Sequence, residues 1–550
     1  MTRPAPIRIL RARRIITMDH NRPTATHVAI RDGRILGVGD LADLTGWGSY
    51  ELDERFADKV LMPGFVEGHS HTFEGSVWTT PYVGFDDRIG PDGRRWPGLK
   101  SIDAVVERLI EAEASMTDPD TPLFAWGLDP IFFEGRRMIA SDLDRVSKRR
   151  PVIVMHQSCH LLNINSVALA RVGISAATNI HGVLMGEDGQ PTGELAEAAA
   201  TYMVYRTLGN PYRVAVSRES MYRFAHAACI AGITTATDLH MALDDATVAT
   251  YRKVTVEDDY PLRVVPAFAA MTASTEEGVA KVKALMQHNN PKLKFGLVKI
   301  MTDGSIQGFS ARLRWPGYYN GAPNGVWNQP PEVLAKVVDA YHDAGLHIHA
   351  HVNGDEASEL LLDLIERALT RLPRPDHRYT LQHCQMADEA QFKRMAALGV
   401  AVNLFSNHLF YWGEQHLAIT IGPDRAARID AAATALRHGV ALAIHSDAPV
   451  TPLGPLFTAW CAVNRRTRAE RVLGEAECIP LEAALHAITM GPAYTLKMDH
   501  IVGSIAVGKL ADLAVLEDDP YEIGVERLKD VRVWGTVVGG RDFEAPRVSR

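Results

Sequence analysis

The sequence predicts an α/β fold whose largest part is a closed (β/α)8 barrel, and three observations lead to this prediction. Eight apolar, strand-like stretches alternate with alanine-rich amphipathic stretches through the middle of the chain. Segments rich in β-branched residues lie at both chain ends. About 160 residues separate the first predicted barrel strand from the second, which is too many for one crossover helix.

The eight strand-like stretches are apolar and run into polar residues. They begin at Lys59, Gly232, Leu262, Phe295, Leu346, Tyr379, Val400 and Val440. Residues 330–345 and 388–399 are examples of the amphipathic helices expected between them. Repeated βα units with apolar strands indicate a parallel sheet covered by helices, and eight of them suggest a closed, TIM-like barrel.

The remaining segments predict the domain organisation. Residues 1–60 and 500–550 should form one small β-sandwich domain, with a hairpin turn at Asp32-Gly33. Residues 61–499 should form the barrel. Within them, residues 75–225 should form an inserted subdomain over the barrel mouth, where substrate would enter.

Composition narrows the class of protein. The chain has 550 residues, 46% of them hydrophobic, and a net charge of −8, so it can bury a large core and shows no sign of nucleic-acid binding. Its five cysteines form no C-x-x-C pair, which is typical of reduced thiols in a cytoplasmic protein. No signal peptide or apolar run of about 18 residues is present, so no membrane segment is expected.

The predicted strand ends carry a set of metal-binding residue types. Because chemistry in such barrels belongs at the C-terminal ends of the strands, side chains distant in sequence should meet at one rim. In chain order they are His69 and His71, Lys299, His351, His383 and Asp447. Imidazole and carboxylate are ordinary ligands of zinc and similar divalent ions, and alternate residues such as His69 and His71 point to the same side.

Each of these residues has a simpler interpretation when taken alone. Lys299 could pair with an acidic residue, His383 could be a structural histidine, and Asp447 could cap a turn. Together, these interpretations would require coincidences at five strand ends. A neutral Lys299 could instead add carbon dioxide, giving a carbamate with one oxygen for each of two metals and a bridging hydroxide between them. On strand five, His351 is preferred because it is nearest the strand end, with His349 as the alternative.

With these residues, the sequence resembles the amidohydrolase superfamily, in particular the branch that includes N-substituted formamide deformylases. The resemblance covers nearly the whole chain. It is carried by the stretches PGFVEGHSH, VKIMTDGS, HVNGDEA, LQHCQ, HSDAPV and GSIAVGKLADLAVL. It implies a binuclear metallohydrolase with the six ligands already named. Three positions depart from the pattern: Glu67 replaces Asp, FSNH replaces Q-P-x-H, and Glu356 replaces Arg.

The resemblance also implies substrate contacts. His160, in HLLNINSVAL, would bind the substrate carbonyl and take part in catalysis, although it could be a buried structural histidine. His408 would contact substrate, although it could be an ordinary loop histidine. Phe309 and Trp412 are aromatic candidates for the pocket wall, unless they pack the loops.

The predicted function is hydrolysis of a non-peptide amide, an N-acyl or N-formyl C–N bond, of a small apolar or aromatic molecule. The cofactors would be two divalent ions, zinc in the first place, with a carbamate on Lys299. Asp447 would take the proton from the attacking water and pass it to the leaving nitrogen. The alternatives are a mononuclear deaminase, an esterase or lactonase, and a non-catalytic relative. A homodimer is a family-level expectation.

Overall fold

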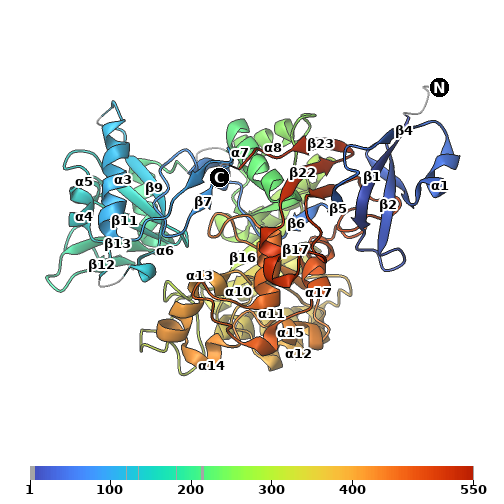
Figure 1. Ribbon diagram of the computed structural model, residues 1–550. Coiled ribbons are helices and arrows are strands. Elements are labelled where there is room, and N and C mark those ends of the chain that lie inside the picture. The colour runs from blue at the N-terminus through green and yellow to red at the C-terminus, as the bar shows by residue number, and fades with distance from the viewer. Residues whose placement is uncertain (1–5, 119, 134–135, 181, 212–215, 549–550) are drawn as a thin grey trace. The chain divides into compact units, whose positions relative to one another are not determined.

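The computed structural model describes residues 6–118, 120–133, 136–180, 182–211 and 216–548 (Figure 1). The chain forms two compact units. The first, here called the barrel unit, comprises Met1–His71, Ala225–Ala448 and Leu453–Pro546. The second, here called the inserted unit, comprises Thr72–Phe224, Pro449–Pro452 and Arg547–Arg550.

The barrel unit contains the predicted eight parallel strands. In sheet order they are β6 (Phe65–Glu67), β14 (Ile233–Met241), β15 (Arg263–Ala269), β16 (Leu297–Met301), β17 (His347–Val352), β18 (Thr380–His383), β19 (Ala401–Leu404) and β20 (Leu442–Ile444). A parallel bridge between Ser70 and Ala448 joins the chain beyond β6 to the chain beyond β20. The predicted barrel is therefore confirmed. The Ser70–Ala448 bridge brings the ends of β6 and β20, which carry several candidate site residues, next to each other.

Helices connect the barrel strands where amphipathic stretches were expected. They include α8 (Asp245–Val254), α9 (Thr275–Leu285), α10 (Pro331–Asp343), α11 (Asp355–Arg371), α12 (Glu389–Leu398) and α15 (Ala432–Arg437). In α11 the buried positions Leu361, Leu362, Ile365 and Ala368 recur at helical spacing, so one face packs on the sheet. A capping box between Asp388 and Gln391 explains why α12 begins where it does.

Both chain ends contribute to one eight-stranded sheet in the barrel unit. The strands are β1 (Ile7–Ile16), β2 (Thr24–Arg31), β3 (Arg34–Gly39), β4 (Tyr50–Asp53), β5 (Val60–Pro63), β21 (Leu513–Leu516), β22 (Val533–Val538) and β23 (Arg541–Glu544). β1 pairs with β4 along its first half and with β5 further on. Asp32 and Gly33 have φ of 52° and 73°, as the expected hairpin turn requires.

The stretch predicted as the first barrel strand divides into two strands at Gly64. β5 pairs with β1 and β21 in the terminal sheet, whereas β6 pairs with β14 in the barrel. A Cβ at Gly64 would lie 2.1 Å from the Thr234 hydroxyl, so glycine is needed where the chain passes from one sheet to the other. The predicted boundary at residue 61 therefore shifts to this glycine.

The inserted unit has its own sheet and its own core. The sheet order is β12 (Val183–Met185), β13 (Pro191–Ala196), β11 (Leu161–Ile164), β10 (Val152–His156) and β9 (Leu123–Leu128). Helices α3 (Ile102–Ala114), α4 (Ala140–Asp144), α5 (Ser166–Val172) and α6 (Glu197–Leu208) belong to the same unit. Its predicted location over the barrel mouth stays a prediction. In the described part of the chain, no helix has both the length and the apolar character of a membrane span.

Candidate metal centre

The closing contact of the barrel brings the His-x-His pair next to Asp447. His69 and His71 follow β6, and Asp447 follows β20. The Asp447 N–H donates to the carbonyl of His69 (3.0 Å), and the His71 N–H donates to the carbonyl of Ala448 (2.9 Å). These backbone hydrogen bonds hold the three side chains at one rim of the barrel, as the sequence predicted from strand ends alone.

The ligand atoms of these residues converge. Nε2 of His69 and Nε2 of His71 each lie 3.3 Å from Oδ1 of Asp447. Nδ1 of His383 lies 3.8 Å from Oδ2 of the same carboxylate. The ring centroid of His383 is 4.5 Å from that of His69 and 4.6 Å from that of His351. The ligand atoms of His69, His71 and Asp447 are therefore grouped closely enough to share an ion, and the rings of His383 and His351 lie beside them.

Lys299 lies in the middle of β16 and is 1% exposed. Its Nζ has no hydrogen-bond partner among the described residues. Burial lowers the pKa of this amine to about 7, against the opposing effect of the Asp447 carboxylate. A buried lysine with no partner does not fit the simpler interpretation of a structural ion pair.

Buried polar atoms that lack hydrogen-bond partners indicate whether these residues could bind a metal ion. Nζ of Lys299, Nδ1 of His383 and Oδ1 of Asp447 are all buried without a hydrogen-bond partner in the described part of the structure. Buried polar atoms normally have a partner, because losing hydration without compensation is costly. Nitrogen and carboxylate oxygen are the donors that divalent ions such as zinc accept, so the residues present fit a metal centre.

Two of the candidate ligands have left-handed backbone conformations. φ is 68° at His383 and 54° at Asp447, and Cys384 follows with 50°. Such conformations are uncommon for residues other than glycine, and they cluster at functional sites where the surrounding structure holds them. The backbone at the ends of β18 and β20 is thus held in an unusual geometry at the residues that carry the donors.

The two candidate ligands of strand five, His349 and His351, differ in their contacts. Both ring nitrogens of His349 are in use: Nε2 donates to the carbonyl of Thr495 (2.9 Å), and Nδ1 accepts from Gln382 Nε2 (2.7 Å). His349 is also fully buried, one layer deeper in the barrel. The ring of His351 faces His383, and its Nε2 lies 3.3 Å from the carbonyl oxygen of Gly304, so the choice of His351 as the ligand stays a prediction.

Gln382 and Glu67 hold the His69 segment in place. Oε1 of Gln382 accepts a hydrogen bond from Nδ1 of His69 (2.8 Å), which leaves Nε2 directed at Asp447. The Glu67 carboxylate accepts from the N–H of His69 (3.2 Å) and from Oγ of Ser446 (2.7 Å). Burial raises the pKa of Glu67 to about 8. Glu67, which replaces the aspartate of the family pattern, thus connects the segments that follow β6 and β20.

Gly354 lies three residues after His351, where the mononuclear deaminases of the family usually carry a glutamate. A Cβ at Gly354 would lie 1.7 Å from the carbonyl oxygen of Arg312, so the backbone leaves no room for any side chain. The absence of the glutamate is therefore a consequence of how two loops pack.

The predicted substrate residues of the barrel unit are engaged in packing. His408 is 1% exposed, with Nδ1 3.0 Å from Nε2 of His416 and Nε2 3.2 Å from Oε1 of Gln307. Trp412 is fully buried and stacks on His408 at 4.3 Å. Phe309 is half-buried against Tyr318. These contacts support packing roles, and substrate contact by these three residues stays a prediction.

His160 lies in the inserted unit, immediately before β11. Its Nδ1 is 3.1 Å from Oε2 of Glu197, and its side chain is partly exposed. The neighbouring Cys159 has a φ of 62°. Contact of His160 with a substrate carbonyl stays a prediction.

His445 lies beside the candidate ligands, although the strand-end pattern did not predict it. Its ring lies 4.7 Å from that of His69 and 5.0 Å from that of His383. The available signal was its spacing, because His445 and Asp447 are alternate residues, like His69 and His71.

Known proteins of similar sequence and structure agree with this fold and this candidate metal centre. The chain belongs to the amidohydrolase family, which it matches over residues 57–542. It is 28% identical to the protein LONG AFTER FAR-RED 3 of Arabidopsis thaliana (96% of this chain, 90% of that protein). It is 25% identical to the N-substituted formamide deformylase of Arthrobacter pascens (98% of each chain). A metal-dependent hydrolase structure from Pyrococcus horikoshii OT3 superposes with a TM-score of 0.70 at 19% identity, covering 94% of this chain and 98% of that one.

Proposed function

We propose that this protein is a binuclear metal-dependent hydrolase that cleaves a non-peptide amide, an N-acyl or N-formyl C–N bond, of a small molecule. The observation that carries the proposal is Lys299, a buried lysine without a partner next to a converging set of histidines and Asp447. The full-length similarity to a formamide deformylase supports the choice of bond.

The proposed ligands are His69, His71, Lys299 as its carbamate, His351, His383 and Asp447. Zinc is the first candidate because the set is rich in imidazole. Two such ions, when bound, supply Lewis-acid chemistry that lowers the pKa of a water and polarises a carbonyl oxygen. The buried surroundings of Lys299 favour its neutral amine, which is the form that adds carbon dioxide.

The chain's own residues provide the proton transfers. Asp447 is nearly buried, and its Oδ1 has no hydrogen-bond partner among the described residues. In the proposed reaction this carboxylate accepts the proton of the attacking water and delivers it to the leaving nitrogen. His160 would donate a hydrogen bond to the substrate carbonyl. Gly354 makes the deaminase alternative the weaker candidate, whereas ester and lactone substrates would use the same groups.

The metal content of Lys299→Ala tests the binuclear centre. Protein purified without chelator and supplied with bicarbonate should hold about two ions per chain by elemental analysis, and Lys299→Ala should lose at least one of them. A short carboxylic acid should partly restore binding, because it can replace the carbamate oxygens. Lys294→Ala is the matched control, since this largely buried lysine donates to the carbonyls of Leu496 and Lys497.

A screen of candidate substrates tests which type of bond the enzyme cleaves. N-formyl and N-acyl arylmethylamines should be turned over, and aliphatic amides of equal size more slowly. Turnover of aminated heterocycles alone, together with a single ion that is indifferent to Lys299, would contradict the proposal. A preference for esters would leave the proposed metal centre standing but would show that the bond cleaved is an ester and not an amide.

A further inference from the structure

We propose that His445 is a direct metal ligand, so that one ion of the centre is held by three imidazoles, those of His69, His383 and His445. The inference rests on the proposed function in one respect only, because it places a metal at the same centre. It adds to the six proposed ligands a seventh residue, which the strand-end pattern did not predict.

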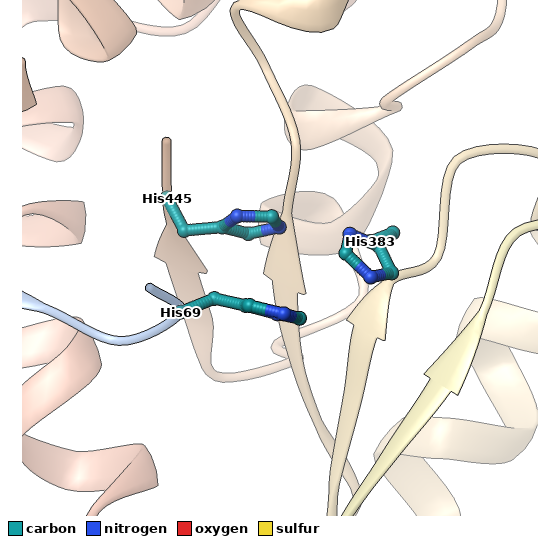
Figure 2. Close-up of side chains that lie close together, drawn as sticks. All are labelled: His69, His383 and His445. Carbon is teal, nitrogen blue, oxygen red and sulfur yellow. The ribbon is translucent and has the colours of Figure 1, made fainter. Parts of the chain in front are cut away.

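The first support is the convergence of the three rings. One nitrogen from each of His69, His383 and His445 lies within 4.8 Å of the other two. Figure 2 shows the rings of His445 and His69 one above the other, with His383 beside them. The three residues come from the ends of β20, β6 and β18, so distant parts of the sequence supply one compact donor set.

The second support is the lack of any other partner for His445. Its side chain is completely buried, and neither Nδ1 nor Nε2 has a hydrogen-bond partner in the described part of the chain. Two other buried histidines of the barrel unit differ in this respect. His342 uses both nitrogens, bonding Tyr379 and the carbonyl of Leu372, and His349 bonds Gln382 and Thr495. A buried imidazole with two unused nitrogens next to other donors is typical of a ligand.

The ring of His445 is held on both faces. It stacks between His69 (4.7 Å, 23°) and Phe405 (4.8 Å, 27°). Because an ion lies in the plane of each imidazole that binds it, the His69 and His445 rings would turn out of this stacked arrangement to share one ion. His69 also belongs to a second donor group, with His71 and Asp447. Because Nδ1 of His69 is hydrogen-bonded to Gln382, its remaining nitrogen can bind only one ion, so a second ion would be held by His71 and Asp447 without His69.

The test compares His445→Phe with His342→Phe in the purified full-length protein. Phenylalanine keeps a flat ring between His69 and Phe405 but removes both nitrogens. Zinc titration against a competing chelator should show one site weakened more than about 100-fold in His445→Phe, since loss of an outer hydrogen-bond partner alone costs roughly 10–100-fold. The visible spectrum of the cobalt(II) protein should change as well. His342→Phe should bind both ions as the wild type does.

A second variant gives a direct signature if His445→Phe folds poorly. In His445→Cys, a side chain that reaches the ion should produce a thiolate-to-cobalt charge-transfer band in the near ultraviolet. Unchanged zinc affinities in His445→Phe, or a folded His445→Cys without this band, would overturn the inference and assign His445 to a bridging water. Metal binding that depends on His445 in a protein that hydrolyses no amide would instead refute the proposed function and leave the inference standing.

Discussion

At the scale of single residues, the hydrogen bonds of Gln382 show how the ligands are oriented. Its Oε1 accepts from Nδ1 of His69 and from Nδ2 of Asn403 (2.9 Å), while its Nε2 donates to Nδ1 of His349. One buried amide thus sets the orientation of the candidate ligand His69 and of His349 next to it. All four side chains are buried, so each hydrogen bond is made without competition from solvent.

Gln382→Met should weaken metal binding about 10–100-fold, because it removes the partner that directs His69 and leaves the ring free to turn. Chelator competition with zinc measures this. Gln391→Met is the control, since Gln391 is equally buried but caps α12 and bonds Asp355 and Glu359 instead. Equal zinc affinities in the wild type and Gln382→Met would show that His69 is held by other contacts.

At the scale of elements, the turn from β17 to α11 explains why the strand-five end has its particular sequence. The Asp303 carboxylate accepts from the N–H groups of Asn353 (3.0 Å), Gly354 (2.9 Å) and Arg312 (3.0 Å). These bonds draw the loop after β16 against the start of α11. The approach is so close that only glycine fits at position 354.

Gly354→Ala should reduce stability by about 1–3 kcal/mol or more, because its Cβ would overlap the Arg312 carbonyl and force the two loops apart. Thermal unfolding and the yield of soluble protein measure the effect. Gly46→Ala is the control, since its Cβ would meet no atom within 4 Å. A Gly354→Ala protein that melts with the wild type would mean that the loops separate easily.

At the scale of the whole barrel unit, one buried ion pair joins the barrel to the sheet built from the chain ends. Arg263, on β15, pairs with Asp512, just before β21, and both side chains are 3% exposed. Asp512 also accepts from the N–H of Gly539 (2.8 Å), and its carbonyl accepts from the N–H of Gly64 (2.9 Å). These contacts connect the sheet built from both chain ends to the barrel, next to Gly64, where β5 ends and β6 follows.

Asp512→Leu should destabilise the protein by about 3–5 kcal/mol, because it leaves the Arg263 guanidinium buried without its counter-charge. Denaturant unfolding measures this, and adding Arg263→Met should recover part of the loss. Asp343→Ala, which breaks a solvent-exposed pair with Arg371, should change stability far less. Equal losses in the two single variants would show that the buried pair contributes little.

Much of the fold and most of the candidate ligands could be predicted from the sequence. Apolar runs located seven of the barrel strands and the approach to the first one, because each signal lies within a few neighbouring residues. The strand-end rule then selected His69, His71, His383 and Asp447, whose ligand atoms converge in the structure. The division at Gly64 could not be predicted in this way, because both strands are apolar and only their pairing partners distinguish them.

The sequence by itself determined the class of fold, the order of the strands and the types of side chain at the barrel rim. Only the tertiary structure decided which buried histidines have partners and which do not. His349 is satisfied by Gln382 and Thr495, whereas neither nitrogen of His445 has a hydrogen-bond partner among the described residues, and nothing in the local sequence distinguishes them. The physical reason is that hydrogen-bond satisfaction depends on atoms contributed by distant segments, whereas periodicity depends on neighbours along the chain.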